Sequence, residues 1–209
     1  MRRLLVATTN PHKVREIRTL LAVAPVEIVG LDQLPGIREP EETGRTFDAN
    51  ARLKAQYYAA AAAQRQARID LTVAEDSGLV IDALEGAPGV ESARFLGADA
   101  TYPERFAEIF RRLDAHPDRP RTARFVCALA VADAHGRIVF ETTGRVEGRI
   151  AREARGTAGF GYDPIFYYPP YGRTLAEVDE EAKLHVAHRG HAFRALERWL
   201  EERGTEKPE

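Results

Sequence analysis

The chain has 209 residues, of which 44% are hydrophobic and 30% are charged, so it is long enough for one packed domain with a charged surface. A formal net charge of -2 and the lack of any run of basic residues argue against nucleic acid as a partner. No apolar stretch approaches a membrane span or a signal peptide, and a single cysteine, Cys127, allows no disulfide within the chain. We therefore expect a cytoplasmic globular protein that does not enter a membrane.

The first part of the chain alternates strand and helix patterns. Asn10 and Pro11 are typical of a helix start, and Val14, Ile17 and Leu20 follow at helical spacing. In chain order, the pattern predicts a strand over 3–9, a helix over 10–23, a strand over 26–31, a polar loop over 35–45, a long helix over 46–67, and two strands over 71–76 and 79–84.

The second part predicts a different order of elements. It contains an amphipathic helix over 103–115, two long strands over 122–133 and 137–151, a loop rich in glycine, proline and aromatic residues over 157–172, and a final helix over 191–202. The two long strands are joined by AHG and predict an antiparallel hairpin. Alternating strands and helices followed by a hairpin indicate a mixed α/β sheet.

The stretch VAEDSGLVIDAL places two adjacent carboxylates, Glu75 and Asp76, directly before Ser77 and Gly78. Asp, Ser and Gly are ordinary turn residues, so the stretch taken alone favours a turn between two strands. Adjacent carboxylates also attract a divalent cation or perturb each other's proton affinity, which makes a metal or general-base site the alternative.

The segment TTNPHK, from Thr8 to Lys13, lies where the first strand leads into the first helix. Such a turn presents backbone N–H groups and the positive end of a helix to a phosphate, and Lys13 adds a point charge. No glycine-rich loop accompanies it, so an ordinary capped helix is the simpler interpretation of this segment alone.

Asn50 and Lys54 share one face of the predicted helix over 46–67, after the loop acids Glu41 and Glu42. An asparagine and a lysine so placed can bind a phosphate or a carboxylate, although charges on a helix face are usually solvated. Only four of the 30 basic residues are lysines, and three of them lie in or beside the segments that carry these polar groups, which favours positions that need a compact ammonium.

Two later segments add aromatic and cationic groups. In AGFGYDPIF, two glycines flank Phe160 and would let the backbone approach a ligand while the ring stacks on it; a core aromatic loop is the alternative. In EEAKLHVAHRG, Lys183 precedes His188 and Arg189 by one to two helical turns, which suits a phosphate or a base edge, whereas a solvated helix face is the alternative. All these segments together describe a site for a nucleoside triphosphate with a metal.

The order and spacing of these motifs resemble the inosine triphosphate pyrophosphatase family nearly from end to end. The matching stretches are LLVATTNPHKVREI, TFDANARLKA, AEDSGLVIDAL, PGVESARF, GFGYDPIF and TLAEVDEEAKLHVAHRGHA. The resemblance implies hydrolysis of dITP, ITP and XTP to the monophosphate and pyrophosphate, with Mg²⁺. It also implies an α/β fold, with an elongated mixed β-sheet flanked by helices, two lobes with the active site in the cleft between them, and a homodimer. The whole chain, 1–209, would form this single domain, with a polar tail from about 202.

The same resemblance assigns roles by position in the motifs. Asp76 would be the catalytic carboxylate and touch the metal, Glu41 would be a further metal ligand, and Glu75 is close enough to contribute. Residues that would bind the triphosphate, base and sugar are Thr8, Thr9, Asn10, Pro11, His12, Lys13, Lys54, Ser77, Phe160, Gly161, Tyr162, Asp163, Lys183, His188 and Arg189.

Two positions depart from the family pattern. Thr9 stands where the first motif usually has glycine, which matters if that position needs a positive φ or a close phosphate. Ala187 stands where a serine usually precedes His188, and its loss costs about 0.5–2 kcal/mol if that serine caps the last helix. Neither change touches Asp76 or the lysines, so we expect activity to survive.

Two other functions remain open at the level of sequence. A pyrophosphatase of the Maf type would act on other modified nucleotides, and a nucleotide-binding sensor would keep the contacts without catalysis. The GFGYDP and HRG segments favour the purine interpretation by resemblance. The three carboxylates Glu41, Glu75 and Asp76 disfavour the sensor.

Overall fold

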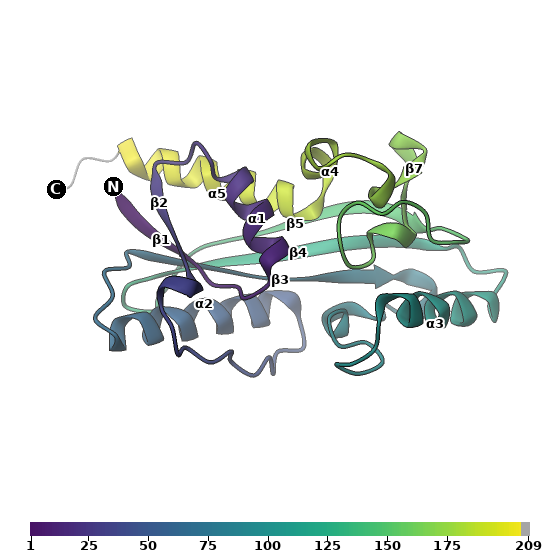
Figure 1. Ribbon diagram of the computed structural model, residues 1–209, viewed down its shortest axis with the longest axis horizontal. Coiled ribbons are helices and arrows are strands. Elements are labelled where there is room, and N and C mark those ends of the chain that lie inside the picture. The colour runs from purple at the N-terminus through teal and green to yellow at the C-terminus, as the bar shows by residue number, and fades with distance from the viewer. Residues whose placement is uncertain (206–209) are drawn as a thin grey trace. The chain divides into compact units, whose positions relative to one another are not determined.

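The computed structural model describes residues 1–205 (Figure 1). The chain divides into two compact units, the first made of Met1–Asp76, Cys127–Gly144 and the chain from Arg189 onward, the second of Ser77–Val126 and Arg145–His188. Its strands form one seven-stranded sheet in the order β2-β1-β3-β4-β5-β6-β7. The polar tail expected from about 202 begins inside the last helix, and residues 206–209 lie outside the described residues.

The first unit begins with the predicted alternation of strand and helix. Its elements are β1 (Arg2–Val6), α1 (Pro11–Leu20), β2 (Val26–Gly30), α2 (Phe47–Gln64), the first part of β3 (Leu71–Ile81), the last part of β4 (Thr122–Asp133), the first part of β5 (Ile138–Ile150), and most of α5 (His188–Thr205). β1 pairs in parallel with both β2 and β3, as expected for strands joined by helical crossovers. Asn10 caps α1 with proline in its first turn, as the sequence predicts.

Helices cover both faces of the strands in the first unit: α1 and α5 lie on one side and α2 on the other (Figure 1). The α1/α5 side contains larger side chains such as Ile17, Val73 and Phe193. The α2 side is built mainly from alanines, including Ala55 and Ala74, which lets the helix approach the strands closely. Val73 and Ala74 lie in different cores because successive residues of a strand point to opposite faces.

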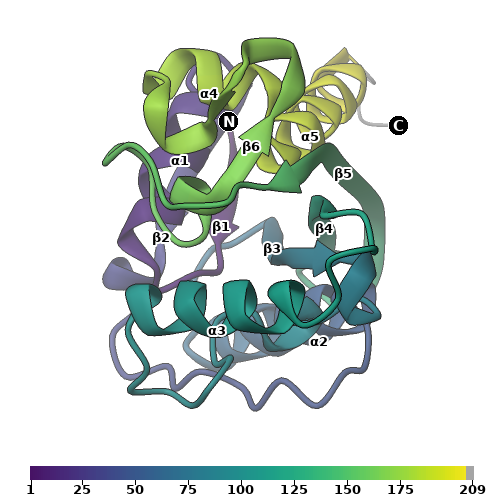
Figure 2. The same ribbon diagram turned by 90° about the vertical axis from the view of Figure 1, so that its right-hand side faces the viewer.

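The second unit holds the remaining elements. They are the rest of β3, the first part of β4 (Thr122–Asp133), the last part of β5 (Ile138–Ile150), α3 (Tyr102–Asp114), β6 (Phe166–Tyr168), β7 (Arg173–Thr174) and α4 (Glu180–Val186). Figure 2 shows α3 on one side of the strands of this unit and α4 on the other. One hydrophobic core joins α3 to these strands, with Phe106, Ile109 and Phe166 among its buried residues.

The expected mixed α/β sheet is confirmed, and so are the long helices and the β4–β5 hairpin. The turn expected at Glu75–Gly78 is wrong, because β3 runs without interruption from Leu71 to Ile81. Gly78 serves close packing instead: a Cβ there would lie 2.4 Å from Ser92 Oγ and 2.5 Å from the Gly89 carbonyl oxygen. The Ser92 hydroxyl also accepts a hydrogen bond from the Leu79 N–H, which fixes the strand at this point.

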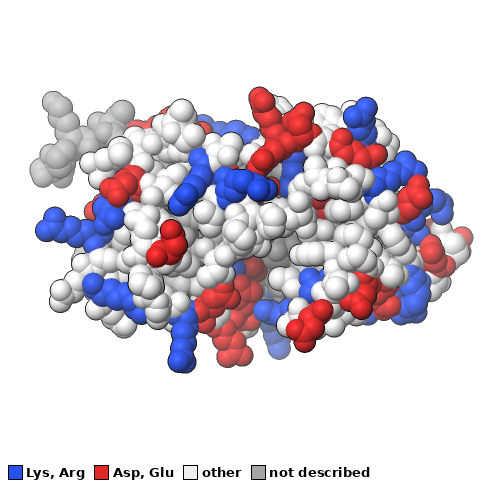
Figure 3. Space-filling view, viewed as in Figure 1, with Lys and Arg blue, Asp and Glu red and all other residues white. Residues whose placement is uncertain are grey.

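Basic and acidic side chains are interspersed on the face drawn in Figure 3, in keeping with the small net charge. Among residues 1–205, no helix has both the length and the apolar character needed to cross a membrane.

Candidate functional site

Glu75 and Asp76 point to opposite faces of β3, because they are successive residues of one strand. Both are buried, but the partners of Glu75 come from α1 and α5, and those of Asp76 come from α2. This corrects the expectation that two adjacent carboxylates are aimed at one point. The two acids take part in separate networks of the first unit.

Asp76 is held by two residues of α2. Lys54 Nζ lies 3.0 Å from Asp76 Oδ1, and Asn50 Nδ2 donates to Asp76 Oδ2 at 3.1 Å. Asn50 and Lys54 are four residues apart, so the single helix face expected from the sequence does meet Asp76. The Lys54 ammonium also lies 2.6 Å from Glu42 Oε1 and therefore bridges two carboxylates.

This arrangement sets the proton affinity of Asp76. Burial raises the pKa of the Asp76 carboxyl above its ordinary value, and the Lys54 ammonium opposes that rise without cancelling it. Burial lowers the pKa of Lys54, but the attraction of Asp76 and Glu42 outweighs burial, so the pKa of Lys54 is raised overall. Asp76 is thus a carboxylate with raised proton affinity beside a lysine whose charged form is favoured.

The loop before α2 is fixed by the same asparagine that holds Asp76. The buried Asn50 Oδ1 accepts a hydrogen bond of 2.8 Å from the Gly44 N–H. A Cβ on Gly44 would lie 2.5 Å from that oxygen, so only glycine fits this approach. The loop brings Glu42 to Lys54, whereas Glu41 is exposed to solvent.

The Thr8–Lys13 turn is a capped helix start in this structure. Asn10 Oδ1 accepts hydrogen bonds from the N–H groups of His12 and Lys13, at 3.0 and 3.3 Å, and the Thr8 hydroxyl accepts one from the Asn10 N–H at 3.3 Å. His12 and Pro11 are exposed. The Lys13 ammonium lies 3.1 Å from Glu75 Oε1, which ties the turn to the middle of β3.

Thr9, which stands where the family motif usually has glycine, does not have a positive φ. Among residues 1–205, the residues other than glycine with positive φ are Gln66, Glu85 and Leu96, so Thr9 adopts ordinary dihedral angles. Its exposed hydroxyl donates a hydrogen bond to Glu39, in the loop that also carries Glu42.

Glu75 lies in a buried network of charges with Arg189. The guanidinium binds Glu75 Oε1 through Nε (3.1 Å) and Nη2 (3.0 Å), and Glu16 Oε2 through Nη1 (2.6 Å). Cys127 Sγ is 2.9 Å from Glu75 Oε2, and burial raises the pKa of this thiol well above its ordinary value. The cysteine is therefore buried. Arg189 is 2% exposed and contacts carboxylates with all three guanidinium nitrogens.

In the second unit, Asp163 organises the glycine-rich loop. Its Oδ2 accepts hydrogen bonds from the Phe160 N–H (2.9 Å) and from Lys183 Nζ (2.7 Å). The Lys183 ammonium also lies over the Phe160 ring, 4.7 Å from its centroid. Gly159 has φ 72°, and a Cβ there would lie 2.2 Å from Asp163 Oδ2, so the turn requires glycine.

Three other predicted residues of this unit have structural partners. The buried Tyr162 hydroxyl donates to the Ser92 carbonyl at 2.8 Å, and the His188 ring stacks on Phe125 with centroids 4.9 Å apart. Ser77 is half-buried, on the β3 segment that opens this unit. Gly161 has φ 68°, a conformation that favours glycine.

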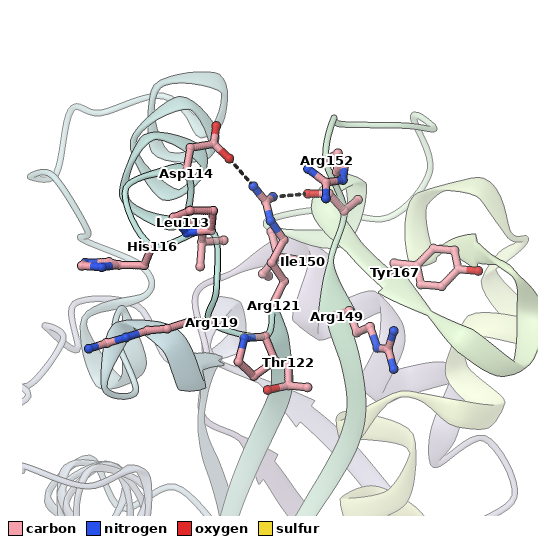
Figure 4. A pocket seen from close by; sticks show the side chains of 13 residues that line it. Leu113, Asp114, His116, Arg119, Arg121, Thr122, Arg149, Ile150, Arg152 and Tyr167 are labelled. Carbon is pink, nitrogen blue, oxygen red and sulfur yellow. Dashed lines mark hydrogen bonds and ion pairs between the residues drawn. The ribbon is translucent and has the colours of Figure 1, made fainter.

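Each unit also contains a pocket. In the first unit, a cavity of about 770 Å³ adjoins the predicted turn and is lined by Thr8, Thr9 and Pro11 together with residues of α1 and of the segment 31–37. In the second unit, a cavity of about 500 Å³ lies among the end of α3, the start of β4 and the end of β5 (Figure 4). Arginines line the second cavity, but Figure 4 shows that Arg119 and Arg149 point to opposite sides of it, and none of the predicted site residues belongs to it.

The donor set around Lys54 fits a hard divalent cation. Within residues 1–205, no three side chains of His, Cys, Asp or Glu form a ready metal-binding group. Glu42 and Asp76 nevertheless share one cation, the Lys54 ammonium, and Mg²⁺ is often held by one or two carboxylates with substrate phosphates and water. Glu75, on the other face of β3, is not part of this pair.

The fold is a mixed α/β sheet with two buried carboxylate–lysine pairs beside a strand–helix turn, an arrangement typical of α/β proteins that bind phosphate groups. The chain belongs to the Ham1 family, whose model matches residues 4–199. The family resemblance inferred from the motifs is thereby confirmed.

Relatives of known name agree with this membership. The chain is 43% identical over 202 residues to a dITP/XTP pyrophosphatase of Halalkalibacterium halodurans, covering 96% of this chain and 100% of that protein. It is 45% identical to one of Geobacillus kaustophilus, covering 97% and 96%. A solved structure of a HAM1 protein from Coxiella burnetii superimposes with a TM-score of 0.87 at 38% identity, covering 97% of this chain and 100% of that one.

Sequence reasoning missed two carboxylates that the structure brings into these networks. The sequence indicates only that Glu41 and Glu42 are neighbouring acids of one loop. The hydrogen bond between this loop and Asn50 determines that Glu42 is the one that contacts Lys54. Glu16 lies in a helix with no motif around it. Its position next to the core residue Ile17 is the one signal that it is buried.

Proposed function

We propose that this protein hydrolyses non-standard purine nucleoside triphosphates, namely dITP, ITP and XTP, to the monophosphate and pyrophosphate. The observation that carries the proposal is Asp76, a 6% exposed carboxylate held between Lys54 and Asn50. Identities of 43% and 45% to named dITP/XTP pyrophosphatases support the same activity.

Asp76 would act as the general base. It accepts a proton from a water molecule whose oxygen attacks the α-phosphorus, while the bond from that phosphorus to the bridging oxygen breaks and pyrophosphate leaves with the electron pair. The raised pKa makes Asp76 a better proton acceptor, while the Lys54 ammonium opposes that rise and favours the ionised form. Positioning and electrostatics carry this kind of reaction more than covalent chemistry does.

The triphosphate would bind to the Thr8–Lys13 turn, with Lys13 as the principal charge. Glu42 and Asp76 would hold Mg²⁺, which when bound neutralises charge on the phosphates and on the leaving pyrophosphate. Glu41, the ligand expected from the motif, is exposed in the same loop. Its neighbour Glu42 has the contact with Lys54 that supports the assignment.

The base and sugar would bind to residues of the second unit. Phe160, ordered by Asp163 and Lys183, offers an aromatic face for stacking, and His188 offers a donor to the oxygen at C6 of hypoxanthine or xanthine. Adenine has an amino group at C6 and would leave that donor unpaired. The loss of this hydrogen bond can favour ITP or XTP over ATP by about 10⁴-fold. Arg189 would also contribute to substrate binding while it stays bound to Glu16 and Glu75.

We further propose that the protein works in the cytoplasm as a homodimer. A single buried cysteine suits a reducing compartment, and removal of aberrant nucleotides from the pool requires access to that pool.

The test is to incubate the purified protein with ITP, XTP, ATP and GTP, each with and without Mg²⁺, and to assay pyrophosphate and orthophosphate separately. We expect pyrophosphate from ITP and XTP only, and only with the metal. Asp76→Asn should lower kcat by about 10²–10⁴-fold because the general base is lost. Asp99→Asn, at an exposed position, is the matched control and should be fully active.

Release of orthophosphate, or equal turnover of ATP, would contradict the proposal. Binding of ITP without any turnover would instead support a nucleotide sensor.

A further inference from the structure

Glu16 is a buried carboxylate on α1, one helical turn after Lys13. Glu16 is 3% exposed, and its neighbour Ile17 belongs to the hydrophobic core on the α1/α5 side of the sheet. An ionised carboxylate in such surroundings is costly unless a cation and hydrogen bonds compensate for the lost water. The compensating group is Arg189, whose Nη1 lies 2.6 Å from Glu16 Oε2.

The same guanidinium determines where Glu75 lies. Arg189 Nε and Nη2 approach Glu75 Oε1 at 3.1 and 3.0 Å, so one planar cation holds two carboxylates on different edges. Because the guanidinium is rigid, fixing one edge with Glu16 fixes the direction of the other edge toward Glu75. Glu16 therefore acts on Glu75 although the two carboxylates belong to different elements.

Glu75 in turn holds Lys13. Its Oε1, the oxygen bound by Arg189, is also 3.1 Å from Lys13 Nζ. The four charged groups sum to zero, with two cations and two anions. Without Glu16, Lys13 and Arg189 would both attract the carboxylate of Glu75 with no second anion from α1 to balance them, so Arg189 would draw that carboxylate away from Lys13.

We infer that Glu16 is a positioning residue for phosphate binding: through Arg189 and Glu75 it fixes the ammonium of Lys13 at the strand–helix turn. This inference rests on the proposed function, in which Lys13 binds the triphosphate. A merely structural role would predict a change in stability alone, whereas positioning predicts weaker binding of phosphate groups by a folded protein.

The test compares Glu16→Gln, Glu16→Asp and wild type in steady-state hydrolysis of ITP with Mg²⁺, and in calorimetric binding of inorganic pyrophosphate. Glu16→Gln keeps the size of the side chain and removes its charge. We expect the KM for ITP and the Kd for pyrophosphate to rise about tenfold, the lower end of what loss of an outer hydrogen-bonding partner costs. The kcat should change far less, because the contact exists before and during the reaction.

Glu16→Asp keeps the charge and should recover part of the binding that Glu16→Gln loses. Glu27→Gln is the matched control, since Glu27 is an exposed glutamate of the same unit that pairs only with Arg3 among the described residues. Arg189→Lys keeps the cation but cannot bind both carboxylates with one planar group, so it should raise the Kd for pyrophosphate, a ligand without base or sugar, in the same way. It serves as the test if Glu16→Gln does not fold.

A folded Glu16→Gln protein with a lower melting temperature but wild-type KM and Kd would overturn the inference. Failure of the proposed function is a separate result: wild type would then not hydrolyse ITP. The pyrophosphate titration would still decide whether Glu16 affects anion binding.

Discussion

At the scale of single residues, Asp76 and Glu75 show how two adjacent acids acquire different roles. Each has a lysine within about 3 Å, Lys54 for Asp76 and Lys13 for Glu75. Asp76 has an asparagine as its second partner and a raised pKa, which suits proton transfer. Glu75 has a buried arginine as its second partner, which suits a fixed charge.

Replacing Lys54 by methionine should move the acid limb of the pH profile for kcat/KM to higher pH. Lys54 is the group that opposes the rise of the Asp76 pKa caused by burial, so its removal lets that pKa rise further. The base is then protonated, and inactive, over a wider range of acidic pH. The measurement is kcat/KM for ITP as a function of pH, from about pH 5 to about pH 9.

Arg52→Met provides the control for that profile. Arg52 lies on the same helix, pairs with Glu141 and does not contact Asp76, so its acid limb should match that of wild type. An unmoved acid limb in Lys54→Met would show that Lys54 does not set the proton affinity of the base.

Residue patterns predicted part of this site. The spacing of Asn50 and Lys54 placed both on the face that meets Asp76, because helical periodicity is a local property. The choice between Glu41 and Glu42, and the burial of Glu16, depend on how distant segments pack. The sequence has no local sign of which glutamate meets Lys54, and the local sign of the burial of Glu16 is its neighbour Ile17 alone.

At the scale of elements, β3 differs most from expectation. Asp, Ser and Gly in sequence indicate a turn, but pairing with β1 and burial on both faces override that preference. The long helices and strands were predictable because their periodic patterns extend over many residues. β6, β7 and α4 contain three, two and seven residues, too few to show a period.

Gly78→Ala should destabilise the protein by about 1–3 kcal/mol, the usual cost of overpacking. The new methyl group would lie against the Gly89 carbonyl, which is backbone and cannot move aside as a flexible side chain can. The measurement is the free energy of unfolding in urea. An unchanged midpoint would mean that the segment around Gly89 yields easily to a larger residue in the strand.

At the scale of the whole molecule, we expect hydrophobic packing rather than a bound ion to maintain the fold. Three hydrophobic clusters stabilise the described part of the chain, two in the first unit and one in the second. Within residues 1–205, no group of three metal-binding side chains lies among these clusters.

Removing divalent ions with a chelator should therefore abolish hydrolysis of ITP while leaving the melting temperature of the protein without nucleotide unchanged. Activity should return when Mg²⁺ is added back in excess. Thermal melts followed by circular dichroism, with and without chelator, make the measurement. A large fall in melting temperature on chelation would reveal a structural role for the ion.

The alternation of Glu75 and Asp76 along β3 has a consequence for how this segment tolerates change. Its pairing frame with β1, Leu4 beside Leu71 and Val6 beside Val73, decides which acid faces which helix. Inserting or deleting one residue ahead of Glu75 would exchange the two faces, so the aspartate would point toward Arg189 and the glutamate toward Lys54. A change of two residues restores the parity. The parity of the residue count before Glu75, as well as the type of each side chain, thus decides which carboxylate faces Lys54.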